Sequence, residues 1–273
     1  MPSSLIGTCS IDPARLAVDL EQVEPNGFID SYDEFVCGSW RTCVLWNATG
    51  DSSDATIRDY PGTGHPTEYG RKLDYLDELM GDNVDLDLLR FARLTRLGPG
   101  TVVVPHRDYV ELAADLTRIH LPLITAAGAY AAEADTVYHM AQGQIWFLDA
   151  SRPHSIANFS DTPRIHLLLD FAGCDPVEVL RNPMRSGIGV PAESIVPRRP
   201  LTAGERATFE ALSGVLDGEN FMDVLAMLIR RYFVAELSIT DVFDWMREIA
   251  VSADRPDLVQ RLDVLASHAL TAR

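Results

Sequence analysis

The stretch Thr101-Val-Val-Val-Pro-His106-Arg-Asp108 decides how this 273-residue chain folds. Three consecutive valines favour a β-strand, because β-branched side chains pack well on a pleated surface. His106 and Asp108 stand two residues apart, so in an extended segment both side chains project from the same face. An imidazole and a carboxylate placed in this way can supply two ligands of a metal site.

A third ligand is offered by His154, at the far end of the strand-like run that begins at Ile145. The three side chains meet only if the two strands fold onto one another. Two histidines and one carboxylate with open coordination positions form the facial triad of non-haem Fe(II) oxygenases. We therefore expect His106, Asp108 and His154 to hold Fe(II) as the catalytic metal centre.

Short strand-like runs surround this motif, with no long helix between them. They cover residues 91–97, 102–104, 118–125, 136–140, 144–148 and 164–171. Evenly spaced short strands indicate a sandwich or a barrel. We expect a double-stranded β-helix, which is the cupin-like jelly roll, with strands 91–97 and 102–104 joined as a hairpin by the turn Leu97-Gly-Pro-Gly100.

Helical patterns flank the predicted jelly roll on both sides. Asp12 and Pro13 suit the cap and first turn of a helix, and leucines recur at helical spacing over residues 73–80. Amphipathic helices are expected at about 203–216, 220–233, 238–250 and 256–269. The predicted chain is α+β, with a jelly-roll core and N-terminal helices in residues 1–176 and a linker with a helical subdomain in residues 177–273.

The composition limits the classes of partner. Forty acidic against 23 basic residues give a formal net charge of −17, which repels nucleic acids and anionic membrane surfaces. No apolar run approaches the roughly 18 to 20 residues of a membrane span, and the N-terminus lacks the features of a secretory signal. Four cysteines without metal-type spacing favour reduced thiols, so we expect a cytoplasmic enzyme, with a homodimer left open.

Arg164 opens a mostly apolar run ten residues after His154. An arginine at the start of a buried strand needs an anionic partner, and its planar guanidinium matches a carboxylate through two hydrogen bonds. The alternative is a surface ion pair with Asp149 or Asp161. We expect a buried anion.

The order of HxD, about 45 residues, His, ten residues and Arg resembles the aspartyl/asparaginyl hydroxylase branch of the Fe(II)/2-oxoglutarate dioxygenases. The segments Pro105-His-Arg-Asp-Tyr-Val-Glu-Leu112, Gly143-Gln-Ile-Trp-Phe-Leu-Asp-Ala150 and His154-Ser-Ile-Ala-Asn-Phe-Ser160 are similar to bacterial L-proline 3-hydroxylases and their pipecolate-hydroxylating relatives.

This resemblance implies Fe(II), O2 and the co-substrate 2-oxoglutarate, with succinate and CO2 as by-products. It implies that Arg164 binds the distal carboxylate of 2-oxoglutarate and that His120 reaches the carboxylate beside the keto group. The implied substrate is a free cyclic L-amino acid, proline or pipecolic acid, hydroxylated at C3.

An amino-acid substrate also needs a cation for its carboxylate and an acceptor for its ammonium group. The candidates for the cation are Arg93, Arg96 and Arg118, and those for the acceptor are Asp30, Asp135 and Glu111.

Three rival hypotheses remain open. A hydroxylase of Asp or Asn in a peptide, or of a carrier-bound residue, would need an open cleft instead of a closed pocket, and segments 51–70 and 174–200 decide between the two. A ligand sensor with a vestigial metal site is disfavoured by the intact triad. A zinc hydrolase is disfavoured because no general base stands beside the ligands.

Overall fold

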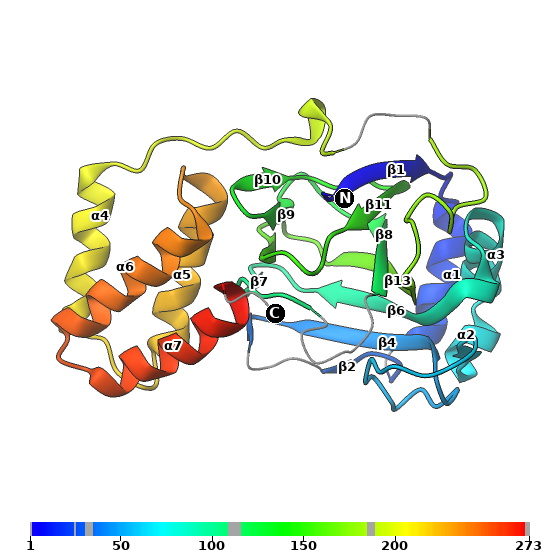
Figure 1. The fold of residues 1–273 in the computed structure, drawn as a ribbon, viewed down its shortest axis with the longest axis horizontal. Helices are drawn as coiled ribbons and strands as arrows, with labels where there is room; N and C mark the ends of the chain where they lie inside the picture. Colours follow the sequence, from blue (N-terminus) through cyan, green and yellow to red (C-terminus); the bar gives the residue numbers. More distant parts are fainter. Residues whose placement is uncertain (1, 25, 31–34, 109–115, 185–188, 271–273) are drawn as a thin grey trace.

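The computed structural model describes residues 2–24, 26–30, 35–108, 116–184 and 189–270 (Figure 1). The strands are β1 (Ser4–Thr8), β2 (Ile29–Asp30), β3 (Val36–Cys37), β4 (Trp40–Asn47), β5 (His65–Pro66), β6 (Leu89–Leu97), β7 (Val102–Val103), β8 (Leu116–Ile124), β9 (Ala129–Glu133), β10 (Thr136–Tyr138), β11 (Gln144–Leu148), β12 (His154–Asn158) and β13 (Arg164–Ala172). The helices are α1 (Pro13–Val23), α2 (Glu68–Lys72), α3 (Asp74–Asn83), α4 (Ala203–Glu210), α5 (Phe221–Val234), α6 (Ile239–Ser252) and α7 (Pro256–Leu270).

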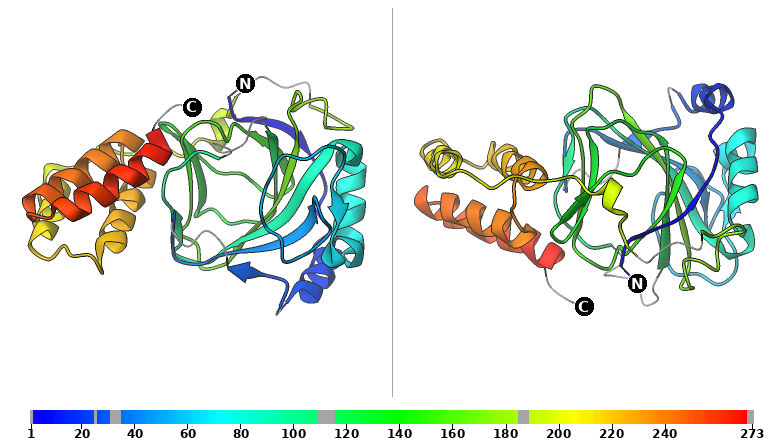
Figure 2. Two further views of the ribbon diagram at one scale, coloured as in Figure 1. Left: turned by 60° about the horizontal axis from the view of Figure 1, so that its bottom comes forward. Right: turned by 90° about the horizontal axis from the view of Figure 1, so that it is seen from above.

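Two antiparallel sheets form the core. The larger sheet has the order β1-β11-β8-β13-β6-β4-β2, with β5 paired to β4, and the smaller has the order β10-β9-β12-β7-β3. The two views of Figure 2 show the strands curling around a common interior. The α+β fold with a jelly-roll core is therefore confirmed.

The turn at residues 97–100 does not close a hairpin. β6 pairs with β4 and β13 in the larger sheet, whereas β7 pairs with β3 and β12 in the smaller one. The turn carries the chain from one sheet to the other, with Gly100 at a φ of +75° that glycine adopts without strain. The hairpin prediction was wrong, because a turn between two strands does not say whether the second strand stays in the same sheet.

Several elements were not predicted. β9 is rich in alanine and β12 begins directly at His154, so neither carries a strong β-branched or aromatic signal. Residues 59–70 are rich in Gly, Pro, Thr and Tyr, a composition that predicts a loop, but they include β5 and the start of α2. Thr67 caps α2 by accepting a hydrogen bond from the Gly70 N–H at 3.2 Å.

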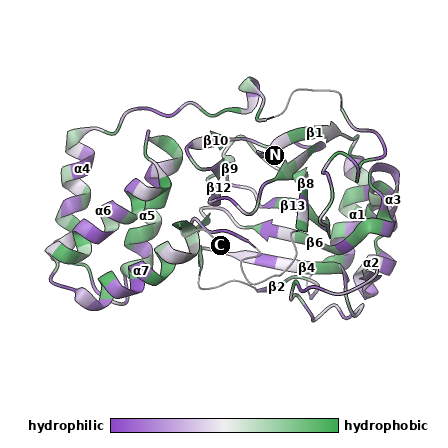
Figure 3. Cartoon of the chain, viewed as in Figure 1, coloured by the Kyte–Doolittle hydropathy of each residue, from purple (hydrophilic) through white to green (hydrophobic). Residues whose placement is uncertain are grey.

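Helices cover the outer face of each sheet. α1 and α3 pack on the larger sheet around a cluster that includes Leu16, Leu76 and Leu167. α5 packs on β3 and β7 of the smaller sheet, and α6 and α7 lie beside α5 (Figure 1). These helices carry both hydrophobic and hydrophilic residues (Figure 3), and their buried hydrophobic side chains form a second cluster with Val102 and Ala157. A third cluster, with Trp146 and Tyr138 stacked at 5.3 Å between ring centroids, fills part of the interior between the sheets.

The predicted helices of the C-terminal region are present at α4 to α7, and two of them begin where a hydroxyl residue stands three positions before an acidic one, the spacing of a capping box. Thr202 with Glu205 and Ser238 with Asp241 each form a reciprocal capping box. Within the described ranges, no helix combines the length and the apolar character that crossing a bilayer demands.

Candidate active site

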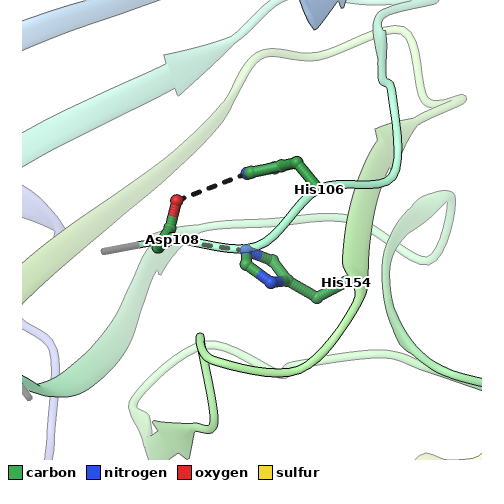
Figure 4. A group of neighbouring side chains, drawn as sticks. All are labelled: His106, Asp108 and His154. Carbon is green, nitrogen blue, oxygen red and sulfur yellow. Dashed lines mark ion pairs between the residues drawn. The ribbon is translucent and has the colours of Figure 1, made fainter. Parts of the chain in front are cut away.

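Three side chains meet where the smaller sheet ends, as Figure 4 shows. His106 Nε2 lies 3.5 Å from Asp108 Oδ1, and His154 Nε2 lies 3.5 Å from Asp108 Oδ2. One ligand atom from each residue lies within 4.8 Å of the others. The structure thus brings the three predicted residues together. Among the described residues, these three form a cluster of metal-ligand side chains.

The backbone explains how the triad forms. His106 lies beyond the end of β7 and makes an isolated antiparallel bridge with His154, with N–H···O distances of 3.0 and 2.9 Å. The Asp108 N–H donates to the Ala150 carbonyl at 2.8 Å, which anchors the residue after the bridge. The two ligands of the HxD motif therefore follow the strand instead of lying within it.

Both histidines present the same ring nitrogen to the common centre. His106 Nδ1 lies 2.8 Å from the Val104 carbonyl, and His154 Nδ1 lies 3.0 Å from the Arg152 carbonyl. A carbonyl can only accept, so Nδ1 carries the proton in each ring and Nε2 keeps its lone pair. A backbone acceptor on the far nitrogen is the usual arrangement behind a metal-bound histidine.

Asp108 is held in its charged form by an arginine. Burial opposes that charge, but the Arg118 guanidinium and the neighbouring histidines outweigh it and keep the pKa of Asp108 well below its usual value. Arg118 bonds Asp108 Oδ2 and also donates from Nε and Nη2 to the two oxygens of Asp170, at 2.8 and 3.0 Å. Arg118 and Asp170 are almost fully buried, so they form a rigid support for this ligand.

The donor set fits Fe(II). Two ligands in adjacent octahedral positions at about 2.1 Å from an ion lie about 3 Å apart, close to the two 3.5 Å separations found here. Two neutral imidazoles and one carboxylate are the ligands of the non-haem iron facial triad. Burial lowers the pKa of His106 to about 4, which keeps its ring neutral and able to bind a metal at neutral pH.

Arg164 lies deep in the interior, at the first position of β13, and is 3% exposed. Its Nη2 lies 2.9 Å from His166 Nδ1, and no carboxylate of the described residues comes within ion-pair distance. Burial lowers the pKa of Arg164 to about 9. A buried guanidinium whose polar partner among the described residues is a neutral ring is suited to receive an anion.

His120 lies on the same interior face. It is 4% exposed, and neither ring nitrogen has a hydrogen-bond partner in the described part of the chain. Burial, followed by the charges of Arg164 and Arg118, holds its pKa well below the usual value, so the ring is neutral. Its ring centroid lies 5.9 Å from that of His166, whose Nε2 is also without a partner.

The candidate substrate cations divide between the two faces of the larger sheet. Arg93 pairs across the sheet with Leu168, which in turn pairs with His120, so all three share the interior face. Arg96 is three residues later and therefore on the outer face, where it forms an ion pair with Glu24.

The two candidate acceptors that the structure describes, Asp30 and Asp135, are exposed. Asp30 is exposed and pairs with Arg41 at 3.4 Å, and Asp135 is exposed in the turn between β9 and β10. Glu111 lies outside the described residues.

Two interior residues escaped the sequence-based prediction. Asp170 was not singled out, although a lone charge in the run Leu167-Leu-Leu-Asp-Phe171 is a signal that a partner is buried with it. His166 lies in the same strand, and its sequence position matches none of the expected metal ligands.

Two family models together match most of the chain. Residues 15–173 match the aspartyl/asparaginyl β-hydroxylases, and residues 176–273 match the C-terminal region of L-proline 3-hydroxylases. An L-proline cis-4-hydroxylase of Rhizobium meliloti is 34% identical over 96% of this chain and 93% of its own length. An L-proline cis-3-hydroxylase of a Streptomyces species is 33% identical over 100% of this chain and 96% of its own length.

Solved structures with some similarity include an oxidoreductase of the 2OG-Fe(II) oxygenase family from Burkholderia pseudomallei. It is 12% identical, with a TM-score of 0.42, over 59% of this chain and 80% of that one. A prolyl-4-hydroxylase of Pseudomonas putida is 14% identical, with a TM-score of 0.38, over 62% and 92%. The family-model match and the full-length relatives carry the assignment, so the chain belongs to the aspartyl/asparaginyl β-hydroxylase family.

Proposed function

We propose that this protein hydroxylates a free cyclic L-amino acid, L-proline or L-pipecolic acid, using Fe(II), O2 and 2-oxoglutarate. The observation that carries the proposal is the convergence of His106, Asp108 and His154 at one end of an interior that also holds a buried cation, Arg164, with no carboxylate partner in the part of the chain that the structure describes. The named activities of the full-length relatives support the same reaction class.

Arg164 is assigned to the distal carboxylate of 2-oxoglutarate. The guanidinium is buried and can bind a carboxylate with two hydrogen bonds, and His166 orients it through the 2.9 Å contact. His120 is assigned to the carboxylate beside the keto group, because its two free ring nitrogens can donate one hydrogen bond and accept another.

Arg93 is the best candidate for the substrate carboxylate. Of the three arginines predicted for this role, Arg96 lies on the outer face and Arg118 is committed to Asp108 and Asp170. Arg93 is 2% exposed on the interior face, beside the row that contains His120. A buried guanidinium there would bind the carboxylate of an amino acid and fix the position of its ring relative to the metal.

A hollow of about 420 Å³ adjoins this interior. It is lined by residues 58–61 together with Arg90, Leu116, Ala172 and Gly173. Leu116 and Ala172 are paired across β8 and β13, two residues beyond the pair of Arg118 and Asp170 that supports the metal ligand. A volume in this range suits a small molecule such as a free amino acid.

When bound, the metal with O2 and the keto acid supplies the oxidising power for breaking an unactivated C–H bond. The protein positions the reactants and keeps water away from them. His106 and His154 offer their Nε2 lone pairs, Asp108 stays charged through Arg118, and the apolar interior around Trp146 excludes water from the reacting atoms.

The test is an assay of purified protein with Fe(II), 2-oxoglutarate, ascorbate and a panel of substrates. We expect succinate formation and a mass gain of one oxygen with L-proline, L-pipecolic acid or both, since pockets discriminate a single methylene by only about 1 to 3 kcal/mol. Hydroxylation at C3 stays a prediction, which product NMR decides, because the named relatives act at C3 or C4. Turnover of an Asp- or Asn-containing peptide, with both free acids inert, would replace this proposal with a peptide hydroxylase.

A further inference from the structure

Arg107 stands between the ligands His106 and Asp108, but its side chain reaches the C-terminal helices. Its Nε and Nη2 donate to the carbonyls of Ala269 and Leu270, each at 3.2 Å. These carbonyls end α7, where helix geometry leaves the last carbonyls without intrahelical donors and where the helix dipole favours a cation. One residue of the HxD segment thus caps a helix about 160 residues away in the sequence.

The strand that precedes the ligands packs on the same helices. Val102 and Val104 are fully buried in the cluster formed by α5, α6 and α7. The Val104 carbonyl is the acceptor that fixes the His106 ring, so the residue that orients this ligand is itself held by the helices. Phe35 packs against that cluster and places its ring 6.3 Å from the His106 ring.

Backbone bonds fix the segment from Val104 to Asp108 on one side. β7 ends at Val103, and the bonds to other described residues are the Val104 N–H to the Phe35 carbonyl, the bridge between His106 and His154, and the Asp108 N–H to the Ala150 carbonyl. Three ligands bind one ion tightly only when they share one geometry, so the contact of Arg107 with α7 adds a second anchor to a segment that carries two of them.

We propose that the C-terminal helices are part of the metal centre, and that Arg107 is the positioning residue that ties the ligand segment to the end of α7. The inference rests on the proposed metal site. Without the tether, the three ligands remain present but sample more arrangements, so metal affinity falls although no ligand is lost. The C-terminal region of the chain therefore serves the active site without contributing a ligand to it.

The test compares two arginines that each donate to a backbone carbonyl across the same interface. Arg107→Met removes the tether at the ligand segment. Arg230→Met is the control, because Arg230 on α5 donates to the Gly100 carbonyl at 2.9 Å, ahead of β7. For full-length protein, Mn(II) affinity is measured by titration, and the visible spectrum of the Co(II) form reports ligand geometry.

We expect Arg107→Met to bind Mn(II) about tenfold more weakly than the wild type, which is the lower end of the loss in metal affinity that changes behind the ligands cause. The Co(II) spectrum of this variant should also differ from that of the wild type. Arg230→Met should stay within about twofold and keep the spectrum. Equal Mn(II) affinities and equal Co(II) spectra in the two variants would contradict the proposed role of Arg107. A wild type that binds no metal would instead overturn the proposed function.

A second variant tests the tether from its other end. A chain that stops at Ser267 lacks the two acceptor carbonyls but keeps Arg107 and all three ligands. This shortened chain tests the proposal even if Arg107→Met does not fold. The proposal expects the same loss of Mn(II) affinity in this chain as in Arg107→Met, and wild-type affinity in the folded shortened chain would refute it.

Discussion

At the scale of single residues, the metal ligands are the sharpest expectation. Changing His106, Asp108 or His154 to alanine removes one of three ligands, and water cannot replace it without disordering the site. We expect each variant to lose hydroxylation and to bind Fe(II) weakly while its far-ultraviolet circular dichroism is unchanged. His65→Ala is the control, since His65 is exposed on β5. Turnover near the wild-type rate in any triad variant would show that the ligand set is misassigned.

Arg164 and Arg93 give a paired prediction, because the two cations are assigned to different molecules. Arg164→Leu places a carboxylate against an apolar wall, and losing a charge-assisted contact of this kind costs about 2 to 5 kcal/mol. The KM for 2-oxoglutarate should rise tenfold or more, with a smaller change for the amino acid. Arg93→Leu should show the reverse. If both variants raise the same KM, the two carboxylate sites have been wrongly divided.

The sequence could predict the triad and the buried position of Arg164, since each depends on local spacing around strands. It could not predict the support behind Asp108. Arg118 faces Asp170 only because β8 and β13 pair in a particular register, which shifts between Ile165 and His166. A shift of one residue turns a side chain to the other face of a sheet, and nothing in the sequence fixes where such an irregularity falls.

At the scale of elements, two glycines with nearly the same backbone conformation make a matched pair. Gly143, before β11, has a φ of +76°, and an added Cβ would lie 2.5 Å from the Cys9 carbonyl oxygen. Gly100, before β7, has a φ of +75°, and an added Cβ would meet nothing within 4 Å. Alanine therefore meets the same conformational cost at both positions and a steric clash only at Gly143.

We expect Gly100→Ala to lower the free energy of unfolding by about 1 to 2 kcal/mol, which is the usual cost of a left-handed alanine. Gly143→Ala should cost at least about 2 kcal/mol more, because the clash is with backbone that also pairs Cys9 to Gly143 at 2.8 Å. Urea unfolding of the two variants measures the difference. Equal losses of unfolding free energy in the two variants would mean that the backbone at Cys9 and Gly143 moves apart without a measurable energetic penalty.

The elements also show where sequence patterns stop being informative. Helix caps at Asp12, Thr202 and Ser238 were readable because capping depends on neighbours within three residues. The sheet to which β7 belongs could not be predicted, because it depends on pairing partners such as Ala157 in β12, some 55 residues away. Local chemistry therefore predicted which elements form better than it predicted which elements pair.

At the scale of the whole molecule, the division of the chain near residue 176 stays a prediction. The C-terminal helices share one apolar cluster with Val102 and Ala157 of the smaller sheet and with Val104, which follows β7. The helices and the jelly roll therefore stabilise each other, even if the boundary marks a change in the type of structure.

Acid stability is the last prediction, and it follows from the neutral histidines inside the jelly roll. Burial lowers the pKa of His106 to about 4, and burial with the Arg164 charge holds the pKa values of His120 and His166 well below normal. A histidine in the unfolded chain takes up a proton below about pH 6.5, whereas these three stay neutral at that pH in the folded protein. The unfolded chain then binds more protons, so stability must fall as the pH decreases through that value.

For metal-free protein kept with a chelator, the free energy of unfolding should fall by as much as about 4 kcal/mol per pH unit below pH 6, since three protons each contribute about 1.4 kcal/mol per unit. Carboxylates with lowered pKa values, such as Asp108, lose their contribution only at lower pH and do not act in this window. Urea unfolding between pH 7.5 and 5.5 measures the slope. His120→Leu should reduce it by about one proton's share and His65→Gln should leave it unchanged, whereas a flat profile in the wild type would mean that the buried rings gain protons without opening the fold.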